Sequence, residues 1–88
     1  MRFQFDPRKA ATSLKKHGVS FVDVEGVFSD PLAIHREDPD TEDEERFIAV
    51  GMGSAGGILV VIYTLRGDEI PLISARRATR NEVKDYER

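Results

Sequence analysis

The chain has 88 residues, 40 % of them hydrophobic and 33 % charged, with a formal net charge of −3. A chain of this length forms one small domain that buries only about 60 to 65 % of its unfolded surface. The absence of cysteine excludes disulfides, thiolate metal sites and cysteine nucleophiles. Neither a signal peptide nor a bilayer-spanning apolar run is visible, so we expect a soluble, cytoplasmic, single domain over residues 1–88.

The charges are unevenly distributed along the chain. Residues 1–20 carry a net charge of +4, residues 21–45 carry −9 and residues 46–88 carry +2. This distribution permits a basic surface built from the two ends of the chain. The acidic middle would then be held away from that surface or used for another partner.

The first residues predict a strand and then a helix. Phe3 and Phe5 alternate with polar neighbours, as in a short strand. Asp6 followed by proline is typical of a helix start, and Gly18 is typical of a helix end. A helix is therefore expected over residues 7–17. The residues expected to face the core are Ala10, Ala11 and Leu14.

A second short helix and the first strands of the sheet are expected next. Apolar residues recur at helical spacing over residues 21–28, and Asp30-Pro31 ends that helix. Residues 32–36 are a candidate strand. Residues 37–45 are interpreted as an acidic loop.

Three strands and a helix complete the expected order. Residues 47–50 form one strand, and residues 58–65, apolar on both faces, predict a central strand covered on both sides. Residues 70–75 form another, at a sheet edge or locally irregular because Pro71 donates no ladder hydrogen bond. Thr79 and Glu82 form a capping box that opens the last helix. The order β-α-α-β-β-β-β-α predicts an α+β fold: a small antiparallel sheet with helices at both chain ends, packed mainly on one face.

The segment from Gly51 to Gly56 matches the G-x-G-x-x-G pattern of dinucleotide-binding loops. Such a site needs a helix to begin there, because the helix N-terminal amides hold the pyrophosphate. A β-branched run follows instead. We therefore interpret the segment as a hairpin loop.

Several arginines lie near predicted strand ends. If the last strand persists, it delivers Arg76 and Arg77 to opposite faces of the sheet. Arg66 lies in the turn before this strand, the capping box orients Arg80 outward, and Arg46 is expected to reach the same sheet end. Guanidinium groups suit phosphate because they donate in a planar fork and stay charged. Solvated surface arginines are the alternative.

His17 is one of only two histidines in the chain. It lies where the first helix is expected to end, a position at which the helix dipole favours a cation. Capping and proton transfer therefore both remain open for it. The two histidines form no recognisable metal spacing, so neither a metal nor another cofactor is expected.

Six segments, in order over nearly the whole chain, together resemble the BrnT toxin family. They are Phe5-Asp6, KHGVSF at 16–21, VFxDP at 27–31, ERFIAVG at 45–51, VVIYTxRG at 60–67 and ISARRAT at 73–79. The resemblance implies a RelE-like fold and a metal-independent endoribonuclease toxin of a type II toxin–antitoxin system, which cleaves RNA and inhibits growth. A BrnA-type antitoxin would neutralise the toxin, and operator DNA would be bound only indirectly, through the antitoxin.

The resemblance also implies which residues act. The expected catalytic residues are His17, Arg66 and Arg76, and the expected RNA-binding residues are Arg46, Arg77 and Arg80. The chain departs from the family segments at Leu65, where glutamate is expected, and at Pro71, where a basic residue is expected. These departures leave a second reading, a catalytically degenerate, non-enzymatic module that binds the antitoxin.

Overall fold

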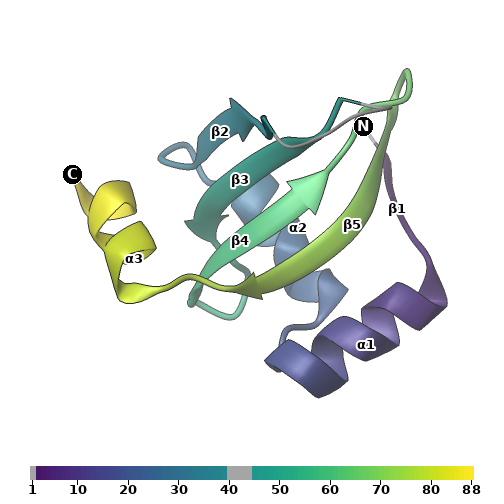
Figure 1. The fold of residues 1–88 in the computed structure, drawn as a ribbon, viewed down its shortest axis with the longest axis horizontal. Helices are drawn as coiled ribbons and strands as arrows, with labels where there is room; N and C mark the ends of the chain where they lie inside the picture. The colour runs from purple at the N-terminus through teal and green to yellow at the C-terminus, as the bar shows by residue number, and fades with distance from the viewer. Residues whose placement is uncertain (1, 40–44) are drawn as a thin grey trace.

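The computed structural model describes residues 2–39 and 45–88, so residues 40–44 of the predicted acidic loop lie outside the described residues. The elements are β1 (Arg2–Phe5), α1 (Pro7–His17), α2 (Phe21–Ser29), β2 (Ile34–Glu37), β3 (Phe47–Met52), β4 (Ile58–Tyr63), β5 (Glu69–Arg77) and α3 (Arg80–Glu87). The predicted order and the α+β class are confirmed (Figure 1). Within the described residues, no helix is long and apolar enough to cross a membrane.

The five strands form one sheet in the order β1-β5-β4-β3-β2. The β2–β3, β3–β4 and β4–β5 pairs are antiparallel, as expected of strands that follow one another in the chain. β1 pairs with β5 in parallel, so the sheet is mixed rather than wholly antiparallel. The reason is that most of the chain separates these two strands, so no hairpin dictates their direction.

The main core lies between the sheet and α2. Phe21 and Val24 of α2 are buried against Leu59 and Val61 of the central strand β4. Val60, which points to the opposite face, is only 2 % exposed. The prediction of a central strand covered on both sides is therefore confirmed.

The third helix lies on the other face of the sheet from α2. α3 contacts β3, and a shallow pocket between them is lined by Val50, Glu82 and Asp85, among others. Val50 pairs with Val60, and both are absent from the cluster under α2. Two helices thus pack on one face and the terminal helix on the other (Figure 1).

The expected inward face of α1 is confirmed at Ala10, which packs partly buried against the core, but it is wrong at Ala11 and Leu14. Leu14 is 56 % exposed and Ala11 is also exposed, whereas Ser13 is 5 % exposed. α1 packs mainly against β5 and only lightly against α2. Because neighbouring helical residues differ in direction by about 100°, turning Ser13 toward β5 turns Leu14 away from it.

β5 shows how the sheet accommodates Pro71. The strand lies between β1 and β4, so the edge alternative is wrong. Its register against β4 shifts: Tyr63 pairs with Leu72, but Ile62 pairs with Ser74. Ile73 is the extra residue of this bulge, which confirms the alternative of local irregularity.

The glycine-rich segment is a β3–β4 hairpin loop, as interpreted. The Gly53 N–H donates to the Gly57 carbonyl at 2.8 Å and closes the turn. The Ser54 N–H donates to the Asp23 carbonyl of α2 at 2.9 Å. The loop therefore packs closely on α2 beside Gly26, where a Cβ would stand 2.7 Å from the Gly53 carbonyl carbon.

Candidate functional site

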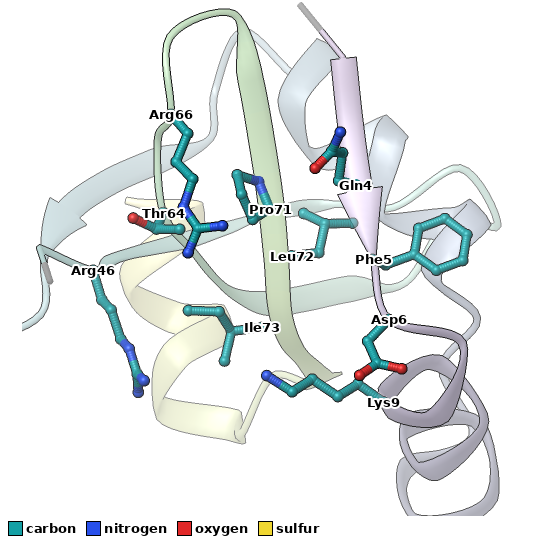
Figure 2. A pocket seen from close by; sticks show the side chains of 10 residues that line it. All are labelled: Gln4, Phe5, Asp6, Lys9, Arg46, Thr64, Arg66, Pro71, Leu72 and Ile73. Atoms are coloured by element: carbon teal, nitrogen blue, oxygen red, sulfur yellow. The ribbon is translucent and has the colours of Figure 1, made fainter.

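A basic pocket lies where β1 passes into α1, next to β5. It encloses about 370 Å³ and is lined by Gln4, Phe5, Asp6, Lys9, Arg46, Thr64, Arg66, Pro71, Leu72 and Ile73. In Figure 2 the charged ends of Lys9, Arg46 and Arg66 lie around Ile73. We call this hollow the basic pocket. It gathers residues that are far apart in the sequence.

Backbone contacts position the two arginines of the pocket. The Thr64 hydroxyl donates to the Glu45 carbonyl at 2.9 Å, which fixes the segment leading into β3 against the end of β4. Arg66 and Glu69 exchange both backbone hydrogen bonds, each at 3.0 Å, around a turn in which Gly67 has a φ of 61°. Because Phe47 at the start of β3 pairs with Tyr63 at the end of β4, Arg46 and Arg66 are held at the same end of the sheet.

Helix capping positions the other charged residues of the pocket. The Asp6 carboxylate accepts a hydrogen bond from the Arg8 N–H at 2.8 Å and begins α1, with Pro7 in the first turn. Lys9 follows in that turn, next to β5 because Phe5 pairs with Leu72. Asp6 and Lys9 therefore share the pocket with Arg46 and Arg66.

Charge in the basic pocket is predominantly positive. Among its described lining residues, Lys9, Arg46 and Arg66 face a single carboxylate, that of Asp6. Sequence reasoning missed Lys9 and used Asp6 only as a helix cap. No sequence signal identified them, because the parallel pairing of β1 with β5 that brings them to the pocket leaves no local pattern. An excess of cations in a hollow favours an anionic ligand.

His17 lines a neighbouring pocket of about 280 Å³, together with Arg8 and Lys16. This second pocket shares Lys9 and Ile73 with the basic pocket, so the two adjoin. His17 also lies in the last turn of α1, before Gly18, whose N–H donates to the Leu14 carbonyl at 2.9 Å. The position at the helix end is confirmed, and a role in proton transfer stays a prediction.

The arginines of ISARRAT lie at the opposite end of the sheet from Arg66. β5 runs antiparallel to β4, so the turn that carries Arg66 and the end of β5 are separated by the length of the strand. Arg76 lies three residues beyond Ile73, about 10 Å along the strand. The expectation that Arg46 reaches the same sheet end as Arg76 and Arg77 is therefore wrong.

Arg76 and Arg77 do point to opposite faces, because β5 persists through both. Arg77 lines a pocket of about 120 Å³ with Gly18 and Val19 on the side of α1 and α2. Arg76 turns toward α3 and donates to both carboxylate oxygens of Glu82, at 2.7 and 2.9 Å. Arg80 is exposed at the start of α3.

Glu82 connects the last helix to the sheet. Its carboxylate accepts from Arg76 and from the Thr79 N–H, while its own N–H donates to the Thr79 hydroxyl, which completes the predicted capping box. These contacts, the Arg76 hydrogen bonds first among them, lower the pKa of Glu82 from 4.5 to about 2. A second contact holds α3: the Tyr86 hydroxyl donates a hydrogen bond to the Asp30 carboxylate, which follows α2, at 2.5 Å.

The Glu82 contacts predict an acid-sensitive attachment of α3. Because the folded-state pKa of Glu82 is lowered, its contribution to stability is present above pH 4.5 and is lost as the pH falls toward about 2. Amide exchange of α3 should therefore accelerate over this range in the wild type. Glu82→Gln should show faster exchange already at neutral pH. Equal exchange in the two proteins at pH 7 would contradict this role.

His35, to which the sequence assigned no role, contacts the aromatic core. Its Nδ1 lies 2.9 Å from the Tyr63 hydroxyl, and its ring lies against Phe28. Burial raises the pKa of Tyr63, so its hydroxyl stays protonated. Within residues 2–39 and 45–88, no three His, Cys, Asp or Glu side chains are grouped to hold a metal ion.

The fold and the basic pocket define a small α+β protein with a cationic surface site suited to anionic ligands. The family model for the "Ribonuclease toxin, BrnT, of type II toxin-antitoxin system" matches residues 5–82. A crystal structure of the Brucella abortus ribonuclease toxin BrnT is similar, with a TM-score of 0.67 and 29 % identity, covering 91 % of this chain and 99 % of that one. No curated protein sequence matches the chain. The chain belongs to the BrnT family of type II toxins, and membership implies an antitoxin partner.

Proposed function

We propose that this chain is a metal-independent endoribonuclease toxin that cleaves RNA at the basic pocket. The family is described as a ribonuclease toxin. The observation that carries the site is the convergence of Arg46, Arg66 and Lys9, from three separate segments, on one hollow. Three cations around a hollow can neutralise a phosphodiester and the additional charge that develops on it during cleavage.

The reaction needs no metal ion. The RNA 2′-hydroxyl oxygen attacks the adjacent phosphorus and the bond to O5′ breaks, which leaves a 2′,3′-cyclic phosphate and a 5′-hydroxyl. Arg46 and Arg66 bind the phosphate oxygens through their guanidinium groups, and Lys9 contributes a third positive charge. O5′ takes a proton from water at the open pocket. The protein's contribution is orientation and charge stabilisation.

Asp6 is the group best placed to accept the proton of the 2′-hydroxyl. One of its oxygens caps α1, and the carboxylate lines the basic pocket. His17 is the second candidate, but it lies two turns beyond Lys9, about 12 Å along the helix axis. That separation suits contact with a neighbouring nucleotide better than contact with the phosphate held by Arg46 and Arg66. The adjoining pocket, with Arg8 and Lys16, would then hold the flanking RNA.

The partners follow from this proposal. RNA occupies the basic pocket, and a BrnA-type antitoxin neutralises the toxin and links it to operator DNA. Arg76 then serves chiefly to hold α3 through Glu82, and Arg77 and Arg80 are outlying contacts for RNA. This assignment differs from that of the sequence, which gave Arg76 a catalytic role.

Cleavage of a labelled, ribosome-free RNA, with a chelator in every reaction, tests the proposal. Asp6→Asn keeps a helix-capping side chain but removes the base, so cleavage should fall by about 100-fold or more with little loss of stability. His17→Ala should reduce cleavage by less than about tenfold. Wild-type products should end in a 2′,3′-cyclic phosphate. Unchanged cleavage by Asp6→Asn would contradict the assignment, and its loss in His17→Ala would transfer the role to His17.

The degenerate, non-enzymatic alternative depends on Leu65. This side chain is 53 % exposed between Thr64 and Arg66, at the position where the family segment suggests glutamate. If that glutamate transfers a proton in relatives, its loss slows this chain. Absent wild-type cleavage, with activity gained in Leu65→Glu, would favour this alternative.

A further inference from the structure

An apolar groove lies between α1 and the beginning of α2. It encloses about 180 Å³, and its lining includes Phe5, Ala11, Leu14 and Val22. The large side chains are well exposed: 48 % for Phe5, 56 % for Leu14 and 67 % for Val22. We call this feature the helix groove.

The fold itself does not account for the helix groove. Single exposed apolar residues are normal on protein surfaces, but contiguous ones mark interaction sites. Here the exposed groups come from three elements, β1, α1 and α2, and line one hollow. α1 presents Ser13 to the sheet and Leu14 outward, so the helix offers its leucine to the groove rather than to the core.

The charges beside the helix groove are basic on α1 and acidic on α2. Arg8 and Lys15 are exposed and lie two turns apart on α1, and Arg8 also lines the neighbouring pocket that contains His17. On α2, Glu25 lies one turn beyond Val22 and is also exposed. A complementary partner therefore places acidic groups over α1 and avoids them over α2.

The helix groove also adjoins the basic pocket. Phe5 lines both hollows, and its ring packs edge-on against Phe21 with centroids 5.6 Å apart. Asp6 follows Phe5 directly and lines the basic pocket. A protein segment seated in the groove would thus lie next to the basic pocket, where it would compete with RNA.

The geometry points to the helix groove as the docking site for an amphipathic, acidic helical segment of the antitoxin. A type II system supplies a protein partner that must bind this chain. Apolar side chains one turn apart on such a segment would cover Leu14 and Val22, as in other helix-in-groove contacts. Acidic side chains would face Arg8 and Lys15. That an antitoxin binds this chain follows from family membership alone. That its binding at the groove blocks RNA cleavage rests on the proposed function as well.

Paired substitutions test this docking site. Leu14→Glu and Val22→Glu should each weaken binding of the cognate antitoxin, co-produced from the same operon, by about tenfold or more in titration calorimetry. Leu32→Glu is the matched control, because Leu32 is 69 % exposed but lies outside the groove. It should bind like the wild type, and all three variants should unfold at similar temperatures.

Cleavage assays add a readout that misfolding does not mimic. Leu14→Glu should still cleave RNA but resist inhibition by antitoxin at concentrations that silence the wild type. Antitoxin affinity unchanged in both groove variants would overturn the docking site. So would a wild-type dimer that Leu14→Glu converts to a monomer, since a second copy of this chain would then occupy the groove. If the wild type does not cleave RNA, the binding comparison still decides the docking site.

Discussion

Replacing Arg66 with alanine is expected to lower the rate of RNA cleavage by about 100- to 1000-fold, the usual cost of losing one donor to the transition-state charge. Arg46→Ala is expected to have a comparable effect, because both side chains line the basic pocket. The melting temperature should change little, since both residues are exposed and lie outside the core. Initial rates on a labelled RNA, at fixed ionic strength, provide the measurement.

Arg36→Ala is the matched control for this prediction. Arg36 is exposed on β2, at the far edge of the sheet from β1, and its removal changes the net charge equally. It should lower RNA affinity only slightly, through long-range charge. Equal losses in Arg36→Ala and Arg66→Ala would mean that overall charge, not the basic pocket, controls cleavage.

Replacing Gly26 with alanine is expected to destabilise the fold, although alanine is the better helix former. Inside α2 the exchange should gain about 1 kcal/mol from helix propensity. A Cβ at Gly26, however, would stand 2.7 Å from the Gly53 carbonyl carbon and closer still to Ser54 N, and these are backbone atoms that cannot rotate away. Overpacking of this kind costs about 3 kcal/mol, so the net loss is about 2 kcal/mol.

Thermal unfolding measures this effect. A loss of about 2 kcal/mol lowers the melting temperature of a domain of this size by roughly 10 °C. Gly57→Ala, in the same hairpin loop, is the control: a Cβ there would meet only Arg77 Nη1 at 3.8 Å, and the residue does not require a positive φ. A stabilised Gly26→Ala would show that the loop moves aside and that its packing on α2 is not fixed.

The sequence predicted the elements better than it predicted their partners. Hydrophobic periodicity and the caps at Asp6 and Thr79 determined the order, because these signals act within a few residues. The parallel pairing of β1 with β5 left no local signal. The sequence therefore did not predict that Asp6 and Lys9 lie near the turn that carries Arg66, and it did not predict the basic pocket.

The adjacent arginines at the end of β5 show the same limit. The alternation of side chains along a strand correctly predicted that Arg76 and Arg77 point to opposite faces of the sheet. Which end of the sheet they occupy depends on strand direction, and the antiparallel pairing puts them opposite Arg66. The prediction for α1 was wrong at Ala11 and Leu14 for a related reason. The helix contacts β5 through Ser13, and helical periodicity alone does not show whether an apolar residue packs in the core or lines a surface groove.

The most direct test of the basic pocket is chemical-shift mapping with a short RNA that carries 2′-O-methyl groups. Such an RNA lacks the attacking hydroxyl and stays intact on the protein. The expected result is that the largest shift changes occur at Lys9, Arg46, Thr64 and Arg66, with smaller ones at His17. Changes confined to Arg76, Arg77 and Arg80 would contradict it, and would move the RNA site to the opposite end of the sheet.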